Sequence, residues 1–259
     1  MNELAVQLRE RRFTNGAINF DRYEVKFNLD EKGKPLGVYF KLNKESNKLI
    51  EEFMLLANRT VAEEIGKVPK GKHAKSFVYR VHDVPDPEKL DTLNSFILRF
   101  GHKIKTTGTK VEVAKSINSL LDKVQSRPEE NLIETIAIRT MSKAIYSTKN
   151  LGHYGLAFDY YTHFTSPIRR YPDMMVHRLL DNYMAGGRSV DQARLEDDCK
   201  HCSEMEILAS NAERDSVKYK QVEFMSDKLG KVYDGVISGV TEWGGYVEIN
   251  ENKCEGMIP

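Results

Sequence analysis

The sequence has few cysteines, no long apolar run and almost no net charge, and each shortage excludes a class of protein. Three cysteines among 259 residues are too few for a disulfide scaffold, and they fit the reducing cytoplasm. No apolar stretch approaches the ~18 residues that a membrane-spanning helix needs. The charged N-terminus also lacks the apolar centre of a signal peptide. We therefore expect a cytoplasmic protein with no membrane partner.

The charge balance places a further limit on function. A formal net charge of +1 leaves the chain without a global basic signature for nucleic acid, so an RNA site must come from local clustering. Hydrophobic residues make up 40% and charged residues 30% of the chain, as in ordinary globular domains. The length allows one large domain, or one domain and part of another.

The first 65 residues predict β structure followed by a helix. Residues 13–20 alternate loosely, as in a strand, and residues 23–42 read as a hairpin with a turn at 31–33. Ser46 is the expected cap of a helix that continues to Ile65, because apolar residues recur on one face.

The middle of the chain is mainly helical by pattern. A strand is expected at 77–81, and Asp86 and Pro87 are a cap and first turn for a helix that Gly101 stops. Later helices are expected from Arg127 through Ile145, over 172–184 and over 191–225, with an aromatic loop at 152–164.

The composition changes near residue 230. From there the chain is rich in glycine and alternates with a period of two, which indicates strands. We expect a domain boundary at 227–230, giving domains 1–227 and 228–259. The last residues, 255–259, stop within a β pattern, so we expect a fragment of a longer protein.

The most informative segment runs from His153 to Arg178 and contains HFTSPIRRY. Ser166 followed by Pro167 favours a helix start, where free backbone N–H groups can face an anion. Arg169 and Arg170 stand at that start, and guanidinium groups suit bidentate phosphate contacts. Arg169, Asp173 and His177 are spaced to share a helix face. The alternative is a capped helix whose arginines form ordinary ion pairs.

This whole segment resembles the signature of the RNB catalytic domain of the ribonuclease II and ribonuclease R family of 3′→5′ exoribonucleases. The resemblance implies that Arg169 lies at the scissile phosphate and stabilises the negative charge of the transition state. Ser166 and Arg170 are candidate RNA-binding residues, and the role expected of Arg170 is in structure or in binding the RNA backbone.

Two further segments carry the same resemblance. Residues 48–58, KLIEEFMLLAN, resemble a family helix in which a glutamate contacts the ribose of the 3′-terminal nucleotide. The motif favours Glu51, with Glu52 as the alternative, and such a carboxylate can read ribose hydroxyls. Residues 12–20 resemble a family strand, which makes Phe20 the candidate for stacking on a terminal base; a core role is the alternative.

The tail, residues 230–247, resembles the beginning of an S1 domain, which is an RNA-binding barrel of the OB type. Trp243 and Tyr246 are then aromatic residues on its binding face that stack on bases. The alternative is that one of them belongs to the core of the barrel. About three strands are expected, too few to close a barrel.

The resemblance also predicts a cofactor whose ligands are missing here. The family hydrolyses phosphodiesters with Mg²⁺ held by clustered aspartates, and the sequence contains no such cluster, so we place it upstream of Met1. Cys199 and Cys202 have zinc-like spacing without a second pair. His82 has no partner nearby in sequence.

Together these features predict an α+β fold: part of an RNB domain, a sheet packed with helices, followed by an incomplete S1 barrel. The expected function is that of a fragment of a hydrolytic exoribonuclease that degrades RNA processively to nucleoside 5′-monophosphates. The expected partner is the 3′ end of single-stranded RNA, bound by a monomer, and the fragment alone is expected to be inactive. The alternative is a non-catalytic RNA-binding module.

Overall fold

The computed structural model describes residues 1–19, 24–41 and 43–259. These residues form two compact units that alternate along the chain. The first unit consists of Met1–Asn19, Lys44–Leu120 and Arg139–Ile207. The second consists of the described residues of 20–43, together with Leu121–Ile138 and Leu208–Pro259. Helices are combined with short antiparallel sheets, which confirms the predicted α+β class.

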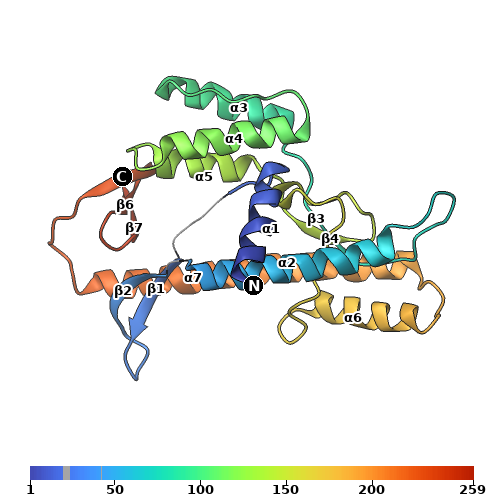
Figure 1. The fold of residues 1–259 in the computed structure, drawn as a ribbon. Helices are drawn as coiled ribbons and strands as arrows, with labels where there is room; N and C mark the ends of the chain where they lie inside the picture. Colours follow the sequence, from blue (N-terminus) through green and yellow to red (C-terminus); the bar gives the residue numbers. More distant parts are fainter. Residues whose placement is uncertain (20–23, 42) are drawn as a thin grey trace. The chain divides into compact units, whose positions relative to one another are not determined.

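Helices make up about half of the described residues. They are α1 (Asn2–Thr14), α2 (Glu45–Gly66), α3 (Pro87–Ile97), α4 (Lys110–Val124), α5 (Glu130–Thr140), α6 (Tyr171–Met184) and α7 (Gln192–Ser226). Two short 3₁₀ turns, η1 (Leu98–Phe100) and η2 (Tyr154–Leu156), complete the set. Figure 1 shows α7 as one continuous, long helix. Among the described residues, no helix has the length and apolar character required to cross a bilayer.

The core of the first unit lies around a two-stranded sheet. Strands β3 (Tyr79–Val81) and β4 (Ile145–Ser147) pair antiparallel, so that Arg80 lies opposite Tyr146. Phe77 is fully buried beside this sheet, and α2, α6 and α7 supply further residues of the cluster around it. These include Ala62, Val176, Leu179, Leu195 and Cys199. The core therefore supports the strands from which the aromatic loop 152–164 emerges.

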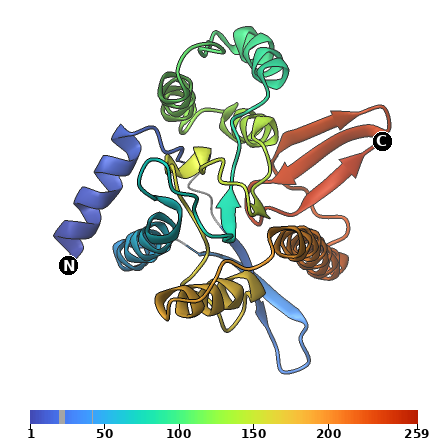
Figure 2. The ribbon, with the colours of Figure 1, turned by 90° about the vertical axis from the view of Figure 1, so that its right-hand side faces the viewer.

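The second unit contains two small sheets. Strands β1 (Glu24–Leu29) and β2 (Pro35–Lys41) form a hairpin, and Phe27 packs edge-on against Phe224 of α7 at 6.1 Å between ring centroids. Strands β5 (Gly235–Thr241), β6 (Gly244–Ile249) and β7 (Glu255–Ile258) form an antiparallel sheet in sequence order (Figure 2). The described strands do not close a barrel.

Most elements with a strong periodic pattern lie where the sequence predicts them. The hairpin at 23–42, the helix over 172–184 and the long helix over 191–225 are confirmed. Asp86 caps α3 by accepting the Glu88 N–H at 2.9 Å. Gly101 ends this region in the left-handed conformation, with φ of 79°.

Three predictions about local structure are wrong. Residues 13–19 are not a strand, because Phe13 and Thr14 complete α1 and a turn follows. Ser46 is not a cap, because Lys44 holds that position and its N–H bonds to the side chain of Asn47. The helix after residue 127 ends at Thr140, and Ile145 begins β4. Helix α4 was not predicted.

Candidate functional site

Two segments that the sequence singles out meet at the side chain of Asn58 on α2. Its Oδ1 accepts the backbone N–H groups of Phe164 and Thr165 at 3.0 and 3.2 Å. Its Nδ2 donates to the hydroxyl of Tyr161 at 3.1 Å. Helix α2 therefore supports the loop that leads to Ser166 and Arg169.

Residues 166–170 form a turn before α6, which corrects the predicted helix start at Ser166. The Ser166 carbonyl accepts the N–H groups of Arg169 and Arg170 at 3.3 and 3.0 Å, so the Arg169 N–H is not free for an anion. Helix α6 begins at Tyr171, with Arg170 as its N-cap and a proline in its first turn. The turn projects Ile168 fully into solvent.

The two neighbouring arginines have different surroundings. Arg170 faces Asp173, with 3.0 Å between Nη2 and Oδ1 and 2.9 Å between Nε and Oδ2, and the Asp173 side chain is fully buried. Arg169 is exposed, and its guanidinium has no partner among the described side chains. The predicted shared face of Arg169 and Asp173 is therefore wrong, because Asp173 is committed to Arg170.

Aromatic and imidazole rings form the base of this loop. The rings of Phe164 and His177 stack at 4.1 Å with an angle of 11°, and His177 Nε2 lies 2.9 Å from the Phe164 carbonyl. Nδ1 of His163 lies 2.8 Å from the Tyr146 hydroxyl. Burial, reinforced by the charges of Arg170 and Arg80, lowers the pKa of His163 to about 2. His163 is therefore neutral at physiological pH.

A bidentate ion pair lies next to the ring of Tyr146. Arg80 contacts Glu206 of α7 at 2.6 and 3.1 Å, and its guanidinium lies 4.6 Å from the centre of the Tyr146 ring. Such planar pairs are geometrically specific. Glu206 of α7 thus holds Arg80 against the Tyr146 ring, and the Tyr146 hydroxyl in turn contacts His163.

The two candidate glutamates of α2 differ in burial. Glu52 is 3% exposed and pairs with the buried Arg12 of α1 at 2.5 Å. Arg9 lies 3.8 Å from the same carboxylate. The Glu51 side chain is 44% exposed and lies 3.7 Å from Arg12. Glu52 therefore holds α1 against α2, whereas the Glu51 carboxylate is accessible to a ligand.

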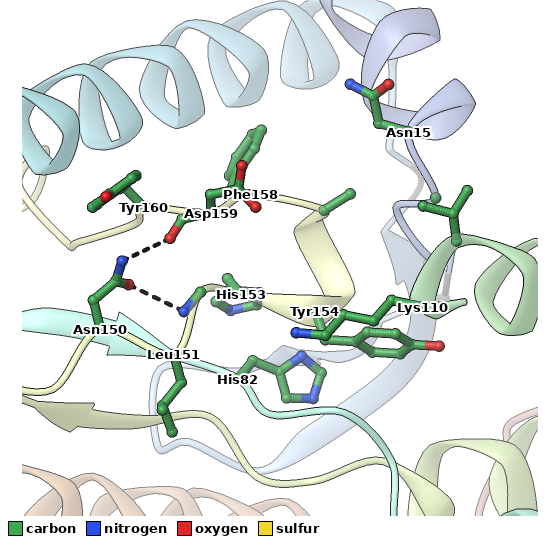
Figure 3. Close-up of a pocket in the computed structure, with 14 residues that line it drawn as sticks. Asn15, His82, Lys110, Asn150, Leu151, His153, Tyr154, Phe158, Asp159 and Tyr160 are labelled. Atoms are coloured by element: carbon green, nitrogen blue, oxygen red, sulfur yellow. Dashed lines mark hydrogen bonds between the residues drawn. The ribbon is translucent and has the colours of Figure 1, made fainter. Parts of the chain in front are cut away.

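A pocket of about 390 Å³ is lined in part by residues of the aromatic loop. Figure 3 shows the side chains that line it. His82 and His153 line it with their ring centroids 5.0 Å apart. Burial lowers the pKa of His153 to about 3. The buried His153 Nδ1 and Tyr154 hydroxyl have no hydrogen-bond partner among the described residues, and Lys110 adds a cation to the lining. Burial lowers the pKa of His82 as well. Two neutral imidazoles and an amino group suit a polar or anionic ligand.

The pocket is the part of the site that the sequence did not predict. His82 appeared isolated, yet its Nδ1 accepts the Gly155 N–H at 3.0 Å across 73 residues of sequence. No local pattern links these positions. His153, the first residue of the segment from His153 to Arg178 that resembles the RNB signature, is the one pocket residue that the sequence singles out.

The remaining predicted site residues lie elsewhere. Phe20 falls outside the described residues. Trp243 lies in the turn between β5 and β6 and is 73% exposed, while Tyr246 lies on β6 opposite Gly239 and Met257. Both belong to the second unit, whereas Glu51, Ser166, Arg169 and Arg170 belong to the first.

The described residues provide no ligand set for Mg²⁺. Within the part of the chain that the structure describes, no three histidine, cysteine, aspartate or glutamate side chains gather to hold a metal ion. Cys199 and Cys202 lie on α7, and burial raises the pKa of the Cys199 thiol to about 12. The residues present therefore do not fit the metal that the resemblance implies.

Comparison with known proteins gives consistent matches. Residues 1–186 match the family model described as RNB domain. The chain is 40% identical over 265 residues to ribonuclease R of Thermotoga maritima, which covers 99% of this chain and 36% of that protein. It is 37% identical over 256 residues to ribonuclease R of Aquifex aeolicus, which covers 97% and 35%. The chain spans about a third of the length of these curated relatives.

Solved structures agree with these matches. RNase R of Mycoplasma genitalium in complex with ribose-methylated single-stranded RNA is similar with a TM-score of 0.85 and 28% identity. The match covers 99% of this chain and 40% of that one. Yeast Ssd1, described as a pseudonuclease, is similar with a TM-score of 0.67 and 26% identity, over 84% of this chain and 27% of that chain.

Proposed function

Because the chain belongs to the RNB-domain family, together with ribonuclease R, we propose that it is part of a hydrolytic 3′→5′ exoribonuclease. The observation that carries this proposal is the difference between the two arginines. Asp173 engages Arg170 and leaves the Arg169 guanidinium exposed on a turn that side chains hold in place. A free guanidinium on a turn whose backbone is held suits a phosphate whose negative charge increases during reaction.

In the proposed reaction, water attacks the phosphorus of the terminal phosphodiester. The bond from phosphorus to O3′ breaks, O3′ takes a proton, and a nucleoside 5′-monophosphate leaves. Arg169 stabilises the charge on the non-bridging oxygens, and Glu51 accepts hydrogen bonds from the terminal ribose hydroxyls. The exposed carboxylate of Glu51, compared with the buried, paired carboxylate of Glu52, supports this choice. Processive action is part of the proposal.

In this proposal, the residues that bind magnesium lie outside the chain. When bound, it would activate the attacking water and offset developing charge. The part that this chain contributes is to hold the phosphate, through Arg169, and to bind the ribose, through Glu51. The proposed domain division, 1–227 and 228–259, adds an RNA-binding surface from the beginning of an S1 domain, with Trp243 and Tyr246 as its aromatic residues.

The test compares Arg169→Ala with Arg194→Ala in the longer protein that contains this chain. Arg194 is also exposed, and its side chain has no partner among the described residues, so it controls for loss of charge. We expect Arg169→Ala to lower kcat by about 10²- to 10³-fold while the Kd for single-stranded RNA changes much less. Equal losses in kcat and affinity would make Arg169 a binding residue and overturn its catalytic role.

A second candidate function is RNA binding without catalysis. It is supported by the lack of a gathered metal-ligand set among the described residues and by the likeness to the pseudonuclease Ssd1. Turnover by the longer protein that contains this chain distinguishes the candidates, because only an exoribonuclease releases mononucleotides from an end-labelled oligoribonucleotide in the presence of Mg²⁺. The isolated chain is assayed under the same conditions, to show whether these residues act unaided. We expect binding without mononucleotide release. Release that scales with the amount of chain would show that these residues catalyse hydrolysis unaided.

A further inference from the structure

Asn58 is a buried polar residue whose amide atoms are all engaged with one distant loop. Its side chain is 3% exposed, and it bonds to Tyr161, Phe164 and Thr165 across 103 to 107 residues of sequence. A buried amide costs free energy unless its donors and acceptors are paired. Here the pairing is directed entirely at the segment that leads into the arginine turn.

The loop depends on this amide for its backbone hydrogen bonds. The N–H groups of Phe164 and Thr165 have no other acceptor among the described residues, and Asn58 Oδ1 takes both. The next N–H, that of Ser166, is taken by Asp173 at 2.7 Å. Three consecutive backbone donors are thus held by side chains of α2 and α6, in place of a strand or helix.

The same helix carries the candidate ribose contact. Glu51 lies two turns before Asn58 on α2, which places the two side chains on nearly the same helix face, about 10.5 Å apart along the axis. Asn58 therefore connects the backbone that bears Glu51 to the backbone that bears Arg169.

We propose that Asn58 is a positioning residue that sets the place of Arg169 relative to Glu51, and that it acts through the backbone of Phe164 and Thr165. This inference rests on the proposed function, because it assigns Asn58 a role in aligning phosphate and ribose. Asn58 itself touches neither. Removing its side-chain oxygen allows the turn to move, so the Arg169 guanidinium no longer meets the phosphate as it gains charge.

The first arm of the test uses the chain itself and needs no activity. Amide hydrogen exchange is compared for Asn58→Leu, which removes all three bonds, and Asn58→Asp, which keeps both acceptor bonds. Asn118 is the matched control, because its amide also bridges backbone groups, accepting the Asn19 N–H and donating to the Ala17 carbonyl. We expect Asn58→Leu to speed exchange at Phe164 and Thr165 by about 10- to 100-fold, with no such change for Asn58→Asp or Asn118→Leu. Unchanged exchange in Asn58→Leu overturns the proposal.

The second arm measures turnover in the longer protein as a double-mutant cycle. We expect Asn58→Leu to lower kcat by about 10²-fold with little change in KM, and Asn58→Asp to retain most activity. Adding Arg169→Ala to Asn58→Leu should cost far less than it costs the parent protein, because the arginine is already misplaced. Independent, multiplying losses would mean that Asn58 only stabilises the fold. If Asn58→Leu does not fold, Asn58→Ser replaces it in both arms.

The two arms separate the inference from the function on which it rests. If Arg169→Ala alone leaves turnover unchanged, the proposed function fails, while the exchange result still decides whether Asn58 holds the loop. If Arg169→Ala abolishes turnover but its loss in kcat multiplies with the loss caused by Asn58→Leu, the proposed function stands and the positioning role fails.

Discussion

Asp173 binds Arg170 and the Ser166 backbone with one buried carboxylate, so the two ends of the arginine turn are joined to the first turn of α6. The Oδ1 atom accepts the Ser166 N–H at 2.7 Å and the Arg170 Nη2 at 3.0 Å. This arrangement gives adjacent arginines separate roles. Arg170 neutralises a buried charge, and Arg169 is left exposed.

We predict that Asp173→Ala destabilises the chain by about 3 kcal/mol or more, because it leaves the Arg170 charge and the Ser166 N–H without their acceptor. Asp173→Asn should cost less, since an amide oxygen still accepts one bond. Urea denaturation measures both. Asp181→Ala is the control, because Asp181 is exposed on the same helix, and its effect should stay within about 0.5 kcal/mol. A similar loss of stability in Asp173→Ala and Asp181→Ala would contradict the role of Asp173.

The error at Ser166 shows why local pattern was insufficient here. Ser followed by Pro favours a helix start on local grounds, but Asp173 takes the Ser166 N–H and the Ser166 carbonyl closes a turn. Residues 13–14 were similarly ambiguous. They are helical in a segment whose Arg12 forms a buried pair with Glu52, 40 residues away.

Helix α4, by contrast, could have been predicted from the spacing of its apolar residues. Its buried residues recur at helical spacing: Val113, Ile117, Leu120, Leu121 and Val124. The site divides in the same way. The arginine turn and the α2 motif can be found from sequence, whereas their junction at Asn58 joins residues 106 apart and carries no local pattern.

We predict that stability falls as the pH drops below about 6.5, because two partly buried histidines resist protonation. Burial lowers the pKa of His163 to about 2 and that of His153 to about 3, from an ordinary 6.5. Below pH 6.5 the unfolded chain therefore binds more protons than the folded chain, so stability is lost as the pH falls toward the folded-state values. Each group contributes a slope of up to about 1.4 kcal/mol per pH unit. Urea midpoints between pH 7 and 5.5 measure it.

Histidine variants identify the source of this slope. His163→Asn should reduce it by about the contribution of one histidine, because asparagine does not titrate. His73→Asn is the control for replacing a histidine, since His73 is exposed. An unchanged slope in His163→Asn would mean that other groups cause the acid sensitivity.

We predict that Gly152→Ala is more destabilising than Gly71→Ala, although both glycines have positive φ, 75° and 90°. A Cβ at Gly71 meets nothing within 4 Å, so that variant reports backbone strain alone, about 1 kcal/mol. A Cβ at Gly152 lies 2.9 Å from the Phe158 carbonyl oxygen, which adds a steric cost of about 1–3 kcal/mol. Thermal or urea unfolding measures the difference. Equal losses of stability in the two variants would show that the loop at Gly152 shifts to accommodate the added Cβ at little cost.

We predict that Trp243 reports RNA binding by the three-stranded sheet. It is the single tryptophan of the chain and 73% exposed, so the protein's indole emission arises from this position in contact with water. Stacking on a base should quench that emission when a single-stranded oligoribonucleotide is added, and each stacked base is worth about 1–3 kcal/mol. Trp243→Ala should therefore weaken binding by about 5- to 150-fold, whereas Tyr219→Ala, which removes an aromatic residue of similar exposure from α7, should not. Two results together would place the RNA on another surface: RNA binding that leaves the emission of the unmutated protein unaltered, and an unaltered RNA affinity in Trp243→Ala.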